Sequence, residues 1–225
     1  MISIVIPSYG RASRISGVLH NIRQTTITPY EIVVVVEPDQ HQEYMAALVP
    51  SNDTILVINE RSRSYAGAVN TAVKFALGDY LFMGSDDLNF HSGWDTEALR
   101  VMNALPNIQV VGTNDLWNKF VLEGVHATHY LVSKTYVDDP GGVVDGERGL
   151  VLYEGYDHNY TDTEFIGTAK ARAAFAPCLT SVVEHLHFTA GKSLRDDTYR
   201  KGYAEIEEDA RTYLRRRELW WNISK

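Results

Sequence analysis

The chain has 225 residues, 44% hydrophobic and 22% charged, which is ordinary globular usage and allows a sizeable core. The formal net charge of −8 argues against non-specific binding to nucleic acid, which needs a basic face, but not against a bound nucleotide. The single cysteine, Cys178, excludes an internal disulfide and a zinc site built from several thiolates, and its apolar neighbours predict a buried thiol.

No signal peptide and no membrane span can be recognised in the sequence. The first apolar run, Ile2–Ile6, is far too short for either, and no run approaches the roughly 20 residues that a span requires. We therefore expect a cytoplasmic protein without a membrane span.

The first ninety residues alternate between strand-like and helix-like patterns. Apolar runs, mostly β-branched, predict buried strands at residues 2–6, 32–36, 54–58 and 80–83. Apolar residues at helical spacing predict helices at residues 13–24, 42–48 and 64–76. Ser13 is the expected N-cap of the first helix, and Gly78 is expected to close the third. This βαβαβαβ order predicts an α/β fold with a mostly parallel, doubly wound, Rossmann-like sheet and helices on both faces.

Polar residues follow each of these four strands, at ends that a parallel sheet brings to one edge. They are Ser8, Tyr9 and Arg11, then Glu37 and Asp39, then Arg61 and Arg63, and finally Asp86 and Asp87. Ligands of such sheets bind beyond the carboxyl ends of the strands, so we expect a site at this edge.

The adjacent carboxylates of Asp86 and Asp87 repel each other unless a cation or hydrogen-bond donors compensate. Oxygen ligands of this kind suit Mg²⁺ or Mn²⁺, usually with a diphosphate completing the coordination shell. The alternative is an Asp-rich turn that caps the next helix.

The pattern after residue 95 is less regular. It predicts helices at residues 94–103, 162–174 and 205–221, and strands at residues 109–112, 128–133 and 179–187. The stretch Asp138–Gly155, rich in Gly and Asp, is expected to be a mobile loop. The last helix carries Arg215–Arg217 before Trp220 and Trp221, and its acidic residues favour docking onto the protein body or a second copy over a membrane surface.

Several of these segments together resemble the family 2 glycosyltransferases of the GT-A fold. Ile4–Arg11 is similar to the family's first strand and nucleotide loop, and Tyr30–Glu37 to its second strand, whose terminal acid contacts the base. The stretch from Asn59 through Asn70 to Asp87 is similar to its third block. The resemblance implies a transferase domain at residues 1–190 and a C-terminal helical extension at residues 191–225. Within the domain it implies a nucleotide-sugar-binding half at residues 1–95 and an acceptor and catalytic half at residues 96–190.

Two positions depart from the family pattern. Gly84 stands where the family's acidic motif has its first Asp, so Asp86 and Asp87 are left to make the metal and ribose contacts. Val69 stands where the family often has an Arg, so neutralisation of the phosphates falls to Arg61 or Arg63, or mainly to the metal.

The resemblance implies a metal-dependent, inverting transferase that moves a sugar from a nucleotide-diphosphate donor, most simply a UDP-sugar, to an acceptor hydroxyl, with Mn²⁺ or Mg²⁺ as cofactor. Asp162 is the expected general base and Glu164 the second candidate, although both also suit helix capping. The implied donor-binding residues are Pro7, Ser8, Tyr9, Arg11, Glu37, Asp39, Arg63, Asn70, Ser85 and Asp86. The implied metal ligands are Asp86, Asp87, His187 and, as the alternative histidine, His185.

The acceptor stays open between a saccharide, a protein side chain and a modified nucleobase. Trp117, His126, His129 and Tyr130 lie in the region where the family builds its acceptor pocket, and the loop Asp138–Gly149 could act as a lid.

Two other classes of function remain. A nucleotidyltransferase-like enzyme would share the sheet and the acidic site, although the chain has neither a Walker-type loop nor a G-x-G-x-x-G motif after its first strand. A degenerate GT-A domain that binds glycans or partners is favoured by Gly84 alone.

Overall fold

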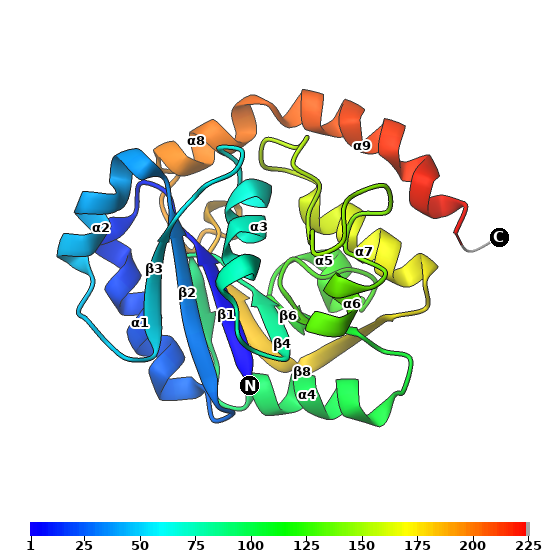
Figure 1. Ribbon diagram of the computed structural model, residues 1–225, viewed down its shortest axis with the longest axis horizontal. Coiled ribbons are helices and arrows are strands. Elements are labelled where there is room, and N and C mark those ends of the chain that lie inside the picture. Colours follow the sequence, from blue (N-terminus) through cyan, green and yellow to red (C-terminus); the bar gives the residue numbers. More distant parts are fainter. Residues whose placement is uncertain (224–225) are drawn as a thin grey trace.

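A central sheet organises the computed structural model, which describes residues 1–223 (Figure 1). Within these residues the sheet has eight strands in the order β3-β2-β1-β4-β7-β6-β8-β5. The strands are β1 Ile2–Pro7, β2 Tyr30–Val36, β3 Thr54–Ile58, β4 Tyr80–Met83, β5 Leu88–Phe90, β6 Val110–Asn114, β7 Tyr130–Ser133 and β8 Phe175–His185. Ser224 and Lys225, at the end of the expected C-terminal extension, lie outside the described residues.

The N-terminal half of the sheet is parallel, as its uninterrupted apolar runs predict. Ile4 of β1 lies opposite Ile32 of β2 and Phe82 of β4, and β3 continues the parallel order beyond β2. The other half is mixed, because β7 runs antiparallel to both β4 and β6, whereas β6 and β8 are parallel. The short β5, which the sequence pattern did not predict, pairs antiparallel with β8.

Helices cover both faces of the sheet and bury the alternating residues of each strand. Ile2, Ile4 and Ile6 face α1, α2 and α4, whereas Val5 faces α3 and α7. The helices are α1 Ala12–Thr25, α2 His41–Ala47, α3 Tyr65–Phe75, α4 Trp94–Ala104, α5 Lys119–Leu122, α6 Lys134–Asp138, α7 Thr161–Ala171, α8 Asp197–Ala204 and α9 Ile206–Trp221. Cys178 is buried in the core on the α1 side, as predicted.

Two predicted helix ends are wrong. Ser13 lies inside α1, and the N-cap position is held by Arg11, whose guanidinium has no acceptor for a capping hydrogen bond and points into the site described below. α3 begins as predicted, with Ser64 accepting from the Gly67 N–H, but its C-cap is Ala76. Gly78 serves close backbone approach instead, since a Cβ there would lie 2.6 Å from the Ser3 nitrogen.

The predicted mobile loop is anchored to the domain. Val143, Val151 and Leu152 are buried, and the side chain of Asn70 on α3 donates to the Leu152 carbonyl at 2.8 Å and accepts from the Val151 N–H at 3.0 Å. A loop that buries apolar side chains and has its backbone hydrogen-bonded is held in place. The Gly and Asp residues of this loop can be recognised in the sequence, but the contact with Asn70 that holds the loop cannot.

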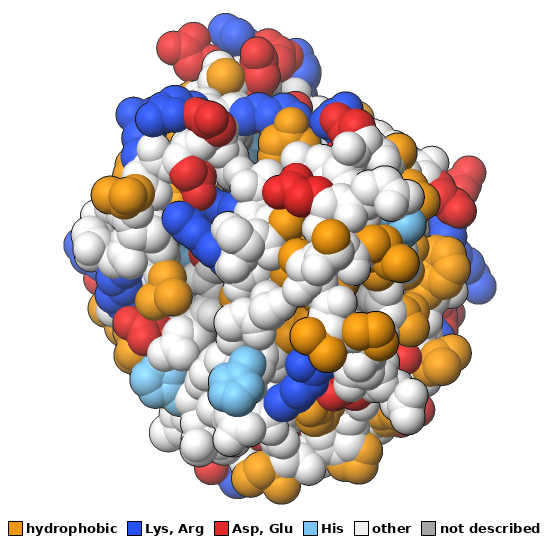
Figure 2. Space-filling model, turned by 90° about the vertical axis from the view of Figure 1, so that its left-hand side faces the viewer, with side chains coloured by type: hydrophobic (Ala, Val, Ile, Leu, Met, Phe, Trp, Pro, Cys, Tyr) orange, Lys and Arg blue, Asp and Glu red, His pale blue; other side chains and the backbone are white. Residues whose placement is uncertain are grey.

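The C-terminal helices lie against the domain along the top of Figure 1. Trp220 of α9 is buried on α7, where a Cβ at Gly167 would meet the indole at 2.8 Å. On the face that carries α1 and α2, basic side chains stand among acidic ones and form no continuous basic surface (Figure 2). In residues 1–223, no helix combines the length and apolarity needed to cross a bilayer.

Candidate functional site

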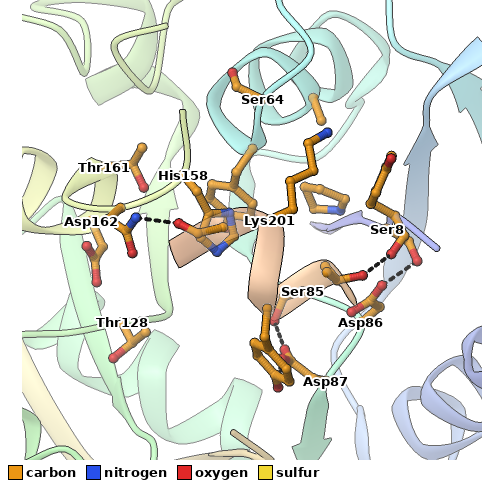
Figure 3. A pocket seen from close by; sticks show the side chains of 18 of the residues that line it. Ser8, Ser64, Ser85, Asp86, Asp87, Thr128, His158, Thr161, Asp162 and Lys201 are labelled. Atoms are coloured by element: carbon orange, nitrogen blue, oxygen red, sulfur yellow. Dashed lines mark hydrogen bonds between the residues drawn. The ribbon is translucent and has the colours of Figure 1, made fainter. Parts of the chain in front are cut away.

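A cavity of about 340 Å³ opens at the carboxyl ends of β1, β2 and β4. Figure 3 shows Asp86 and Asp87 on one side of it, Asp162 and Thr128 on the other, and Lys201 of α8 between them. Twelve of the predicted site residues line this cavity: Pro7, Ser8, Tyr9, Arg11, Glu37, Arg63, Ser85, Asp86, Asp87, Asp162, His185 and His187. The parallel order of the strands brings these separate segments together.

Three predicted residues do not line the cavity. The Asp39 carboxylate is exposed and pairs with Arg63 at 2.6 Å, and Asn70 holds the anchored loop. Glu164 is buried between the guanidinium of Arg216, at 2.8 Å, and the hydroxyl of Tyr156, at 2.7 Å. Positions two apart on a helix face different directions, so Asp162 and Glu164 could not both point into the pocket.

The acidic pair is buried and fully hydrogen-bonded. Asp86 accepts from the Ser8 hydroxyl at 2.5 Å and from Nη1 of Arg11 at 2.6 Å. Asp87 accepts from the Tyr199 hydroxyl at 2.7 Å and from Ser85, and its Oδ2 lies 3.4 Å from Nε2 of His185. Positive groups therefore already face both carboxylates, as two adjacent buried charges require.

The two carboxyl groups have opposite pKa shifts. Burial raises the pKa of Asp86, with the Asp87 carboxylate adding to the rise and Arg11 opposing it. Burial would also raise the pKa of Asp87, but the imidazole of His185 and the guanidinium of Arg11 hold it well below its usual range. Asp87 is therefore the carboxylate that stays ionised most readily.

Arg11 joins the acidic pair to the C-terminal segment. Its Nε and Nη2 contact the two carboxylate oxygens of Asp196 at 2.9 and 3.1 Å, and its guanidinium carbon lies 4.4 Å from the centre of the Tyr199 ring. α8 also supplies Lys201 to the cavity lining. Sequence reasoning missed these contributions, because no apolar periodicity or motif links this segment to the loop after β1.

The two predicted histidines occupy different environments. Nδ1 of His187 lies 2.6 Å from the Thr189 hydroxyl oxygen and 3.2 Å from the Thr189 nitrogen, and the ring is stacked on Trp117. Burial lowers the pKa of His187 to about 4, helped by nearby His185. His185 instead faces Asp87, and its Nδ1 is buried without a partner among the described residues.

The chain's own side chains would provide only part of a metal coordination shell. Among residues 1–223, no group of three His, Cys, Asp or Glu side chains is arranged to hold a metal ion. Asp87 and His185 nevertheless place a carboxylate and an imidazole together at the cavity, a donor set that suits Mn²⁺ or Mg²⁺ when phosphate oxygens complete the shell. The residues present are therefore compatible with a divalent ion that binds together with a diphosphate.

Asp162 stands in the first turn of α7 on the far side of the cavity (Figure 3). Its Oδ2 lies 3.1 Å from Nε2 of His126, and its Oδ1 accepts from the Thr163 N–H at 2.7 Å. Burial would raise its pKa, but the hydrogen bond from His126 lowers it below the usual value. The carboxylate is therefore ionised at neutral pH, as a proton acceptor must be.

The residues expected around an acceptor fall into two groups. Trp117 and His129 line the cavity, whereas Tyr130 is core, with its ring stacked on Phe165 at 4.5 Å, and His126 lies behind Asp162. Burial lowers the pKa of His129 to about 4, so this side chain is neutral at physiological pH.

The half-parallel sheet, with an acidic pair after β4 and a polar loop after β1, has the GT-A fold that the solved structures described below share. Residues 3–183 match the family described as "Glycosyl transferase family 2". The chain belongs to this family.

The chain is similar to curated bacterial proteins over part of their length. It is 27% identical over 128 residues to the Escherichia coli UDP-Glc:alpha-D-GlcNAc-diphosphoundecaprenol beta-1,3-glucosyltransferase WfgD, covering 54% of this chain and 51% of that protein. It is 33% identical over 92 residues to the uncharacterized glycosyltransferase YwdF of Bacillus subtilis, covering 41% of this chain and 34% of that protein. The match thus spans about a third to a half of the length of these relatives.

Solved structures share the fold at low sequence identity. The mannosyltransferase PcManGT of Pyrobaculum calidifontis, in complex with GDP-Man and Mn²⁺, superposes with a TM-score of 0.66 at 17% identity, over 96% of this chain and 62% of that one. Glucosyl-3-phosphoglycerate synthase of Mycobacterium tuberculosis, in complex with Mn²⁺, UDP-Glc and phosphoglyceric acid, gives 0.66 at 13% identity, over 97% and 80%.

Proposed function

We propose that this chain transfers a sugar from a nucleoside-diphosphate donor, with a UDP-sugar as first candidate, to an acceptor hydroxyl with inversion at the anomeric carbon. One observation carries the proposal: in a family 2 fold, the buried pair Asp86–Asp87 and the ionised Asp162 line opposite sides of a single cavity. The fold relatives named above hold GDP-mannose or UDP-glucose with Mn²⁺, which supports this class of donor.

The loop after β1 and the end of β2 would hold the nucleoside. Ser8 and Tyr9 line the cavity beside Glu37, whose Oε1 accepts from Asn59 at 2.9 Å and is thereby fixed in direction. The Tyr9 ring lies within 5.6 Å of the Arg63 guanidinium carbon and 4.3 Å of Nζ of Lys201, so cations surround the place where phosphates would follow the base. Arg63 and Lys201 are therefore candidates to neutralise the diphosphate in place of the arginine that Val69 replaces.

Asp87 with His185 would hold the divalent ion, and Asp86 would contact the ribose. His185 is preferred over His187 because its Nε2 lies 3.4 Å from Oδ2 of Asp87, whereas the contacts of the His187 Nδ1 atom are with Thr189. When bound, Mn²⁺ or Mg²⁺ would offset the charge that develops on the departing diphosphate.

Asp162 would act as the general base. The acceptor oxygen forms a bond to the anomeric carbon on the face opposite the phosphate, while the bond from that carbon to the phosphate oxygen breaks and its electron pair leaves with the nucleoside diphosphate. Asp162 takes the proton of the acceptor hydroxyl. A single displacement of this kind inverts the anomeric centre and needs one carboxylate within hydrogen-bond reach of the hydroxyl.

A saccharide is the acceptor class that the cavity favours. Trp117 lines it with a ring held parallel to His187 at 5.7 Å, and a flat aromatic face suits the apolar face of a sugar ring. The named acceptor of the E. coli relative also carries a sugar, alpha-D-GlcNAc.

Calorimetry with UDP and GDP, each with and without Mn²⁺, tests the donor site directly. We expect one of the two nucleotides to bind, and more tightly with the metal. Absence of binding to both in the presence of Mn²⁺ would reject the proposal and favour a non-catalytic GT-A domain.

Asp162→Asn tests the base. Hydrolysis of the matching nucleotide-sugar, with water as acceptor, should fall at least about 100-fold because the amide cannot take the proton, while nucleotide affinity stays unchanged. Asp79→Asn is the matched control, because the Asp79 carboxylate is exposed, pairs with the amino terminus at 3.0 Å and does not line the cavity. Parallel losses of affinity and turnover would place Asp162 in binding instead.

A further inference from the structure

A histidine that does not line the cavity is hydrogen-bonded to the proposed base. Nε2 of His126 lies 3.1 Å from Oδ2 of Asp162, although 36 positions separate the two residues. We propose that His126 is a positioning residue: it orients the Asp162 carboxylate toward the cavity and supplies the countercharge for its ionised form. This inference rests on the proposed function, because it assigns His126 a part in the reaction of the same site.

The Asp162 carboxylate is held at both oxygens. Oδ1 accepts from the backbone N–H of Thr163 at 2.7 Å and from its hydroxyl at 3.3 Å, and Oδ2 meets His126. Asp162 lines the cavity, but His126 is behind it and has a side chain only 15% exposed. An acceptor in the cavity that Asp162 lines would therefore meet His126 only through Asp162.

The loop that carries His126 is itself braced. The His126 N–H donates to the Phe120 carbonyl at 3.1 Å, and the carbonyl of Val125 accepts from Nζ of Lys170 on α7 at 3.0 Å. Two residues further on, the Thr128 hydroxyl donates to the buried carboxylate of Asp115 at 2.9 Å. A side chain presented by such a loop has a fixed direction, which a positioning role requires.

His126 and Asp162 each shift the pKa of the other. Burial would lower the pKa of His126, but the hydrogen bond to Asp162 raises it above the usual value, with Asp115 acting in the same direction and Lys170 opposing. Burial would raise the pKa of Asp162, but His126, together with the Thr163 N–H and His129, lowers it below the usual value. The titratable groups that face the pair from the surrounding elements are Tyr65, Asp115, His129, Tyr130, His158 and Lys170.

The direction of the pH effect follows from these shifts. A base works only in its ionised form, so turnover falls as pH drops through the pKa of Asp162. His126 lowers that pKa and thus extends activity to lower pH. Removing His126 should raise the pKa of Asp162 and move the acidic limb of the kcat profile to higher pH.

The experiment measures hydrolysis of the nucleotide-sugar identified above by the full chain with Mn²⁺, over a series of pH values. His126→Ala should lower kcat roughly tenfold, leave the donor KM within about twofold, and move the acidic limb upward. His126→Gln keeps an amide donor but no charge, so it should recover most of kcat while the limb stays displaced. His91→Ala is the matched control, because His91 forms a comparable 3.3 Å pair with Glu184 outside the cavity.

A purely structural contact between the loop and α7 would give a different pattern. The proposal is overturned if either variant folds and keeps both the wild-type kcat and the position of the acidic limb. It is also overturned if the donor KM rises and nothing else changes. Failure of the wild-type chain to hydrolyse any nucleotide-sugar would instead reject the proposed function.

Histidine NMR gives a readout that does not depend on turnover. The pKa of His126, identified by the signal that His126→Gln removes, should fall in Asp162→Asn because the neutral amide no longer favours the imidazolium. An unchanged His126 titration would show that the two groups are not coupled, and would overturn the proposal even if His126→Ala fails to fold.

Discussion

At the scale of single residues, the acidic pair has a glycine, Gly84, two positions before Asp86, and both of its carboxylates contact Arg11. The structure leaves little room for a side chain at Gly84, since a Cβ there would lie 2.8 Å from the Ile6 side chain and 2.9 Å from the Val5 carbonyl. Asp86 therefore has no partner carboxylate two positions earlier, and the contacts of Asp87 come from Ser85, Arg11, His185 and Tyr199.

Replacing Asp87 with Asn should weaken UDP or GDP binding at least about tenfold when Mn²⁺ is present, and much less without it. The amide keeps the volume of the side chain but loses the charge that a divalent ion requires. Calorimetry with and without Mn²⁺ measures both affinities, and Asp79→Asn is the control because the Asp79 carboxylate is exposed and lies outside the cavity. A loss of equal size in both conditions would argue against a metal ligand.

At the scale of secondary-structure elements, α7 divides its two acidic residues between different tasks. Asp162 faces the cavity, whereas Glu164 binds Arg216 of α9, which in turn binds Asp145 of the anchored loop at 2.7 Å. Glu164 therefore joins three segments of the chain. The two side chains have different roles because positions two apart on a helix point in different directions. The sequence alone does not show which of the two faces the cavity.

Glu164→Gln should lower the free energy of unfolding by about 3 kcal/mol, because it leaves the Arg216 guanidinium buried with a weakened partner. Urea titration followed by circular dichroism measures this loss, and nucleotide affinity should be unaffected. Glu208→Gln, which breaks an exposed pair with Arg211, should cost less than about 1 kcal/mol. Normal stability with abolished turnover would restore Glu164 as a catalytic candidate.

At the scale of the whole molecule, the C-terminal helices α8 and α9 pack against the domain at residues 1–190. The sequence had predicted them as a separate extension. α8 contributes to the cavity that β1 and β4 open, and α9 buries Trp220 and Arg216 against α7 and its neighbours. The family model matches residues 3–183 and does not include this segment.

Unfolding in urea should therefore be one cooperative transition. Separating α8 from the domain would open the cavity, and separating α9 would expose the buried ion pair of Arg216 with Glu164. Tryptophan fluorescence, which reports all four tryptophans, among them Trp220 in α9 and Trp94 in the core, should give the same midpoint as circular dichroism. Two resolved midpoints would show that the extension unfolds as a unit of its own.

The amino-acid sequence by itself determined the parallel half of the sheet and the residues at its edge. β-branched runs such as Ile32–Val36 can be buried on both faces only in a covered parallel sheet, and βαβ connections bring the ends of successive strands together. That reasoning placed Ser8, Arg11 and Asp86 at one site, where the structure also has them.

Only the tertiary structure decided which of several chemically similar residues faces the cavity. Asp162 rather than Glu164, and His185 rather than His187 against Asp87, depend on directions that neighbouring loops impose. The contacts of Arg11 with Asp196 and of Asp162 with His126 join segments far apart in the chain, and local patterns carry no signal for them. Hydrophobic periodicity specifies elements and faces, whereas the pairing of polar side chains is specified by the packing of those elements.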